Sequence, residues 1–205
     1  MSDPSGSGFS GQEEPWGDLT GGGLSREDRG RLREVAEASI RAGLETGMAL
    51  EPDPEEYPLG LMAPGATFVT LNLDGSLRGC VGSFEAHRSL LDDVARNAFA
   101  AAFRDYRFSP LSRDELVGLD IHISLLTPLS PLAVENRQEL IRLLRPGVDG
   151  LLLHDPPHRS TFLPQVWEAL PDPEDFLGEL LRKAGLPPDH WSDTITFSRY
   201  EVEEF

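Results

Sequence analysis

The strongest constraint on the fold is an Asp-Gly dipeptide that separates two segments rich in β-forming residues. Residues 66–73 (ATFVTLNL) and 76–82 (SLRGCVG) flank Asp74-Gly75. Asp-Gly accepts the positive φ angles of a type I′ turn, which joins two antiparallel strands by a short connection. The sequence therefore predicts a β-hairpin over these residues.

The strand pairing expected within this hairpin contains a conflict. A two-residue turn sets Leu71 opposite Arg78 and Val69 opposite Cys80, so an arginine shares a face with aliphatic side chains. We expect a β-bulge at Gly79 to relieve the conflict by redirecting Cys80. A local inconsistency of this kind is typical of a functional site.

The rest of the chain alternates between short strands and amphipathic helices. Ser or Asn followed three residues later by an acidic residue predicts helix starts at Ser25, Ser89, Ser112 and Asn136. Further strands are predicted at residues 119–126, 150–154, 160–163 and 194–200. Hairpins with helices between them indicate an α+β fold, in which an antiparallel or mixed β-sheet is covered by helices in a single domain with room for a small lobe.

Composition bounds the domain and its compartment. Residues 1–23 are mainly Gly, Ser, Pro and acidic residues, so we expect a disordered tail in which Trp16 is the one side chain able to dock, and residues 24–205 form the domain. The single cysteine allows no internal disulfide, and no apolar run reaches the roughly 20 residues that span a bilayer. The N-terminus lacks a basic and apolar leader, so we expect a cytoplasmic protein without a membrane segment.

The charge and the absent motifs narrow the function further. The formal net charge of −17 argues against a nucleic-acid partner, because phosphate binding requires a basic face. The sequence contains no P-loop, no dinucleotide-binding glycine motif and no metalloprotease histidine motif, so it indicates no particular cofactor.

Cys80 is the main candidate for chemistry. Gly79 and Gly82 flank it and Arg78 precedes it. Glycines let a ligand or another backbone approach closely, and a nearby guanidinium favours the nucleophilic thiolate. In this hypothesis a pocket lies over the Arg78-Gly79-Cys80 hairpin, and Cys80 acts there as a nucleophile or a covalent acceptor. In the alternative, Cys80 is a small buried hydrophobe and the domain is a non-catalytic binding or scaffolding module.

Two other groups could bind a ligand at such a site. Arg107, like Arg78, could hold an anion, although an ion pair with Asp105 would equally account for it. Gln165 follows a strand-ending proline and could hydrogen-bond a ligand or satisfy loop backbone.

Two histidines could in principle join Cys80 in a metal site. His122 and His154 lie on predicted strands, so they could meet Cys80 across a sheet and supply three ligands to zinc or iron. Their spacing matches no metal-binding motif, so no metal site is predicted.

Five ordered segments resemble the AMMECR family, whose domain is protein A of the AmmeMemoRadiSam system. They are residues 77–84 (LRGCVGSF), 97–111 (NAFAAAFRDYRFSPL), 121–132 (IHISLLTPLSPL), 161–167 (TFLPQVW) and 183–191 (KAGLPPDHW). The resemblance covers roughly residues 25–200 and implies an antiparallel sheet with helices.

The resemblance also bears on the site and on partners. The family motifs fall on Arg78, Gly79, Cys80, Gly82, Arg107, Phe108, Pro110, Leu163, Pro164 and Gln165, but they do not carry His122 or His154. The name of the system reflects gene association with a Memo-type protein and a radical S-adenosylmethionine (SAM) protein. It implies these two proteins as partners in a modification whose substrate is an unknown small molecule or protein.

Overall fold

The Asp74-Gly75 turn forms as predicted and begins the first sheet. The computed structural model describes residues 24–205, so the tail predicted for residues 1–23, with Trp16, lies outside the described residues. Asp74 has a φ of 51° and Gly75 a φ of 76°, as a type I′ turn requires. The turn joins β1 (Pro64–Leu73) to β2 (Ser76–Gly82), and the two strands pair antiparallel.

The register of this hairpin differs from the ideal one. Thr70 lies opposite Cys80, and Arg78 is the extra residue of a β-bulge. The prediction that Cys80 faces Val69 was therefore wrong, and the bulge lies one residue before the predicted Gly79. The bulge moves the Cys80 side chain to the face opposite the one predicted, and the Arg78 guanidinium pairs with Glu115 of the segment that follows α2.

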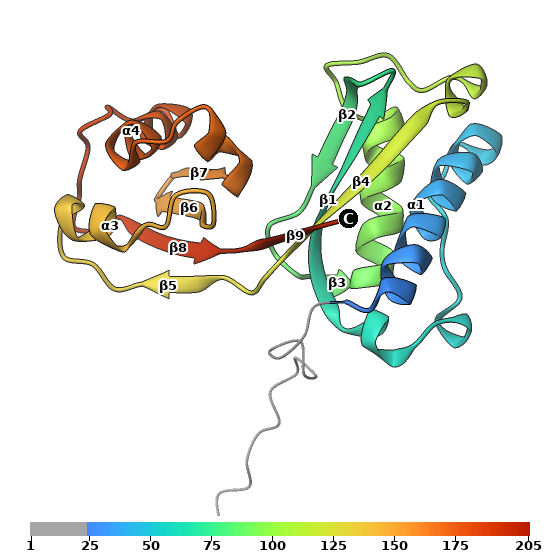
Figure 1. The fold of residues 1–205 in the computed structure, drawn as a ribbon, viewed down its shortest axis with the longest axis horizontal. Helices are drawn as coiled ribbons and strands as arrows, with labels where there is room; N and C mark the ends of the chain where they lie inside the picture. The colour runs from blue at the N-terminus through green and yellow to red at the C-terminus, as the bar shows by residue number, and fades with distance from the viewer. Residues whose placement is uncertain (1–23) are drawn as a thin grey trace, which may run out of the picture.

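The first sheet carries its helices on one side only. Its strand order is β2-β1-β4-β9, and β3 pairs with the start of β1. The added strands are β3 (Arg88–Ser89), β4 (Leu119–Leu126) and β9 (Val202–Glu204). Helices α1 (Arg26–Thr46) and α2 (Leu90–Phe103), capped by Ser25 and Ser89 as predicted, cover one face (Figure 1). Val69, Leu71 and Ile123 are buried beneath them.

A second antiparallel sheet forms a smaller lobe (Figure 1). In the order β5-β8-β6-β7, its strands are β5 (Ser130–Leu132), β8 (Thr196–Tyr200), β6 (Gly150–Asp155) and β7 (His158–Phe162). Helices α3 (Arg137–Leu143) and α4 (Pro173–Lys183) belong to this lobe, and its core contains Trp167 stacked on Phe176 with ring centroids 3.7 Å apart. Antiparallel sheets with helices confirm the predicted α+β class.

Several of the connections contain short 3₁₀-helices. These turns span Pro54–Glu56, Leu59–Met62, Arg113–Leu116 and Pro164–Glu168. Over residues 24–205, no helix combines the length and the apolar character that crossing a membrane requires.

The two lobes share one continuous ribbon of strands (Figure 1). β4 leads into β5 and β8 leads into β9, while β9 pairs with β4 and β5 pairs with β8. Where the lobes meet, Thr127 N donates to Glu201 O at 2.9 Å, and Glu201 N donates to Thr127 Oγ1 at 2.8 Å. Ala66, Leu126 and Tyr200 form a small buried cluster of their own. One backbone bond and one bond to a side-chain hydroxyl, together with this buried cluster, therefore set the position of one sheet relative to the other.

A buried carboxylate ties α2 to the first sheet. Asp93 has no exposed surface and accepts hydrogen bonds from Thr67 N (2.8 Å), Thr67 Oγ1 (2.7 Å), Ser83 Oγ (2.6 Å) and Asn97 Nδ2 (2.9 Å). Burial raises the pKa of the Asp93 carboxyl, and the hydrogen bonds from Ser83 and Thr67 oppose that shift. All four donors point at one side chain, so this position requires a side chain that accepts hydrogen bonds and donates none, as a carboxylate does.

Asp93→Asn should lower the free energy of unfolding by about 2 kcal/mol, because the amide places an N–H₂ group against donors that then lose their acceptor. Urea denaturation measures the loss. The matched control is Asp92→Asn on the next residue, whose carboxylate pairs with Arg96 at the surface and whose removal should cost only about 0.5 kcal/mol. Equal losses in the two variants would contradict a structural role for the buried network.

Candidate functional site

The bulge places the thiol of Cys80 on the face of the first sheet that α1 and α2 do not cover. We call this side, which carries Thr70, Cys80 and His122, the open face. The Cys80 side chain is half-buried there, and Thr70 Oγ1 donates to its sulfur at 3.3 Å. The neighbouring Val81 instead packs on the helix-covered core. The thiol is thus held on the outer side of a rigid strand.

A row of polar side chains crosses the open face. Thr70 lies opposite Cys80 on one side and opposite His122 of β4 on the other. Two strand spacings separate Cys80 from His122, or about 10 Å between backbones. His122 Nε2 lies 2.8 Å from Asp120 Oδ2 on the same strand. His122, Thr70 and Cys80 therefore form a row across three strands, with Asp120 beside His122 on β4, but His122 is too far away to share a proton directly with the thiol.

His154 does not join this row. It lies on β6 in the second sheet, opposite Arg159 and Thr196. Among the side chains of residues 24–205, no group of three His, Cys, Asp or Glu residues is placed to bind a metal ion. The three-ligand arrangement weighed for Cys80, His122 and His154 is therefore not formed by the described chain.

The backbone of Cys80 is fixed by the turn that follows α2. Asp105 Oδ2 accepts from Cys80 N at 2.9 Å, and Arg107 Nη2 donates to Cys80 O at 3.4 Å. Asp105 and Arg107 are themselves joined by Nε–Oδ1 and Nη2–Oδ2 bonds of 2.9 and 2.6 Å. The hydrogen bond from Arg107 holds the pKa of the buried Asp105 carboxyl far below its usual range. The guanidinium expected to bind an anion is thus already paired.

Arg78 is anchored in the same manner. Its Nε and Nη2 donate to Glu115 Oε1 and Oε2 at 2.6 and 3.1 Å, and its side chain is 12% exposed. This hydrogen bonding, with further bonds from Ser112, lowers the pKa of Glu115 to about 2. The guanidinium groups of Arg78 and Arg107 lie 5.9 and 5.4 Å from the centre of the Phe108 ring, so both can make cation–π contacts with it.

The two glycines of the motif serve close packing of the chain. A Cβ atom on Gly79 would lie 2.1 Å from the carbonyl oxygen of Ala101 in α2. A Cβ atom on Gly82 would lie 2.3 Å from the Phe68 ring and 2.5 Å from Thr67 O. Of the two uses expected for these glycines, approach of a ligand or of another backbone, the structure shows the second.

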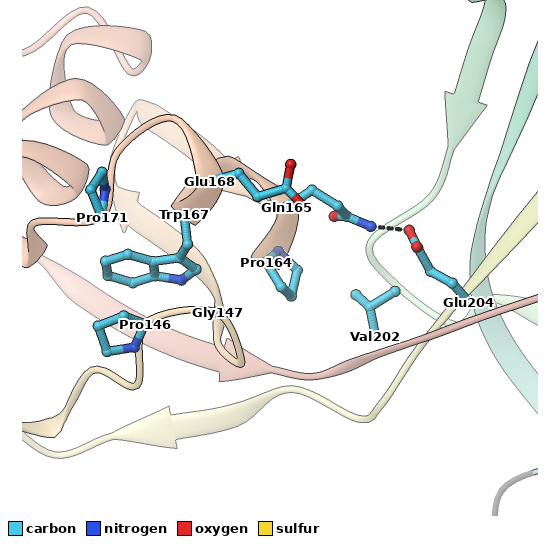
Figure 2. A pocket seen from close by; sticks show the side chains of 9 residues that line it. All are labelled: Pro146, Gly147, Pro164, Gln165, Trp167, Glu168, Pro171, Val202 and Glu204. Atoms are coloured by element: carbon cyan, nitrogen blue, oxygen red, sulfur yellow. Dashed lines mark hydrogen bonds between the residues drawn. The ribbon is translucent and has the colours of Figure 1, made fainter. Parts of the chain in front are cut away.

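Gln165 lies away from Cys80, in the second lobe. Figure 2 shows its side chain pointing from the Pro164–Glu168 turn to Glu204 of β9, whose carboxylate accepts a hydrogen bond from Gln165 Nε2. The residues beside it, including Pro164, Trp167 and Val202, line a cavity of about 440 Å³. Glu204 also accepts from Ser124 Oγ of β4 at 3.2 Å, so Gln165 connects the second lobe to the first sheet.

Three residues that shape the site were not singled out from the sequence. Thr70 contacts the thiol only because of the bulge, and Glu115 was read as a helix-capping residue. Asp105 was considered only as a partner of Arg107, although its position two residues earlier favours the loop hydrogen bond that it accepts from Arg107 N at 3.2 Å.

Glu115→Gln should destabilise the fold by about 2 kcal/mol at neutral pH, because it leaves the partly buried Arg78 guanidinium without its carboxylate. The folded pKa of Glu115 is depressed to about 2 from an ordinary value of 4.5, so the stability it contributes is present above pH 4.5 and is lost as the pH falls toward 2. Urea titrations at several pH values should show the difference from wild type shrinking over that window. A pH-independent difference would contradict the ion pair as its source.

Comparison with known proteins assigns these motifs to a family. Residues 33–205 match the family model described as AMMECR1. A protein from Methanothermobacter thermautotrophicus is 38% identical over 188 residues, which cover 89% of this chain and 95% of that relative. A protein from Saccharolobus solfataricus is 38% identical over 175 residues, or 82% of this chain and 76% of that relative.

A solved structure shares the fold as well. The crystal structure of an uncharacterised protein from Pyrococcus horikoshii superposes with a TM-score of 0.76 at 32% sequence identity, and the match covers 85% of this chain and 88% of that one. The family match, the sequence relatives and the shared fold agree with the resemblance found in the sequence. This chain belongs to the AMMECR1 family.

Proposed function

We propose that this protein is a cytoplasmic component of a three-protein modification system, together with a Memo-type protein and a radical SAM protein. In this proposal the open face receives the substrate, and Cys80 acts there as nucleophile or covalent acceptor. The observation that supports the proposal is the position of the thiol, which points away from the helix-covered core and accepts a hydrogen bond from Thr70.

The chemistry proposed for Cys80 is group transfer. The thiol gives up its proton to solvent, the sulfur forms a bond to an electrophilic carbon of the donor, and the donor's leaving group departs with the bonding electron pair. Thr70 Oγ1 can donate to the sulfur as negative charge develops on it, and Asp105 and Arg107 prevent the strand from shifting during the step. Arg78 acts through its bond to Glu115 as a positioning residue.

The alternative is a non-catalytic binding or scaffolding module. The observation that favours it is that every part of the Arg78-Gly79-Cys80 segment has a packing task. Arg78 binds Glu115, Gly79 contacts the backbone of α2, and the N–H of Cys80 binds Asp105. A segment of this kind would keep its sequence for structural reasons even if the thiol never reacted.

The reactivity of the thiol in the folded protein tests its placement. Iodoacetamide should label native Cys80 within about tenfold of the rate measured in urea, because the sulfur lies on the open face. The matched control carries Cys80→Ser with Val69→Cys, which moves the sole thiol to a fully buried position on β1, across the sheet from the open face. That control should react about 100-fold more slowly than native Cys80. Native Cys80 reacting as slowly as the buried thiol would remove the catalytic role and leave the binding module.

Co-expression with the Memo-type and radical SAM proteins of the same organism tests the system. We expect the three proteins to co-purify, and intact mass spectrometry to find an adduct on this chain that maps to Cys80 and is missing in Cys80→Ser. If the proteins do not associate, the proposed membership of the system fails. If wild type and Cys80→Ser associate equally and neither carries an adduct, the scaffolding alternative is correct.

A further inference from the structure

A second cavity lies where the two lobes meet. Its volume is about 680 Å³, within the range of sites that hold small organic molecules. It is bounded by the segments at residues 60–66, 84–90, 125–129 and 201–203, together with Leu24. The Thr127–Glu201 hydrogen bonds of the ribbon form one of its walls.

Most of the wall is apolar. Pro64, Ala66, Phe84, Leu126 and Leu129 are among the residues that line it. The Phe84 ring is held in place against Phe68, with ring centroids 4.8 Å apart. Such a surface gains free energy when it takes up an apolar body from water.

The polar groups in the wall have one sign of charge. Glu85, Glu201 and Glu203 line the cavity, and the remaining polar side chains there are Thr127 and His87. None of the 19 lining residues is Lys or Arg. Among the described residues, a ligand would therefore meet three carboxylates at the wall itself, with their paired arginines outside the lining, so a cationic ligand would meet complementary charge there.

Arginines outside the wall hold these carboxylates in position. Glu201 Oε1 lies 2.8 Å from Arg145, Glu203 Oε1 lies 2.6 Å from Arg29, and Glu85 pairs with Arg159. The contacts of Glu201 and Glu203 both involve Oε1, and within residues 24–205 no hydrogen bond is made to the Oε2 atom of Glu201 or Glu203, so that oxygen can accept from a ligand.

We propose that this cavity binds a small organic cation, an amine with an apolar body, whose charged end lies among Glu85, Glu201 and Glu203. The ligand would lie between the first sheet and the ribbon that joins the lobes. The site is separate from the role proposed for Cys80, so Cys80→Ser should leave it unchanged.

Three ligands with the same alkyl chain but different head groups separate the contribution of the apolar chain to the affinity from that of the charged head group. Calorimetric titration of the full chain at pH 7 with decylamine, 1-decanol and decanoate should give saturable binding of one decylamine per chain. Decanol should bind about tenfold more weakly than decylamine, and decanoate more weakly still. Decanoate binding as tightly as decylamine would overturn the proposal, since it would show that the carboxylates do not select the head group.

Variants locate the binding. Ala86→Trp should fill the cavity and weaken decylamine binding at least about tenfold, and Leu129→Trp serves the same purpose if the first variant does not fold. Glu203→Gln should weaken decylamine about fivefold and leave decanol unchanged. The matched control is Glu204→Gln on the next residue of β9, which lines the other cavity and should change neither. Unchanged decylamine affinity in a folded cavity-filling variant would show that the amine binds elsewhere.

Discussion

Two hydrogen bonds between Thr127 and Glu201 fix the point at which the strands cross from one sheet to the other. β4 continues into β5, and β8 continues into β9. The two resulting segments pair with each other twice, as β4 with β9 in the first sheet and as β5 with β8 in the second. The contact of Gln165 with Glu204 and the cavity beside Phe84 both lie along this ribbon. A change in the twist at the crossing would therefore alter both features together.

The local elements could be predicted because their causes are local. Asp74 and Gly75 adopt the positive φ angles that these two residue types tolerate, and the side chains of Ser25, Ser89 and Asn136 cap the helices that follow them. The position of the bulge has a different origin. Gly79 must face the backbone of α2, and Arg78 must reach Glu115, which is 37 residues away in sequence. Neither requirement can be read from the hairpin, so the register was misplaced by one residue.

The candidate site shows the same division. Residue types identified Cys80, its glycines and the two arginines, yet the partners that determine what these groups can do come from distant segments. Arg107 contacts the backbone of Cys80 across 27 residues, and Thr70 reaches the sulfur only in the bulged register. Pairing with Glu115 and Asp105 changes the arginines from expected ligand-binding groups into supports for the strand. The thiol takes no part in these ion pairs, and its one hydrogen bond within the described chain comes from Thr70.

The bonds from Asp105 and Arg107 to Cys80 also decide how another protein can approach. β2 is the last strand of its sheet, and an unpaired outer strand is a template on which a further chain can add. An incoming strand would need the N–H and the C=O of Cys80 to be free. The carboxylate of Asp105 already accepts from that N–H, and the guanidinium of Arg107 already donates to that C=O, as a neighbouring backbone would do. Strand addition is blocked at that point, both for a second copy of the chain and for an extended peptide. The route to Cys80 that stays open is therefore the flat side of the sheet, where the thiol itself lies.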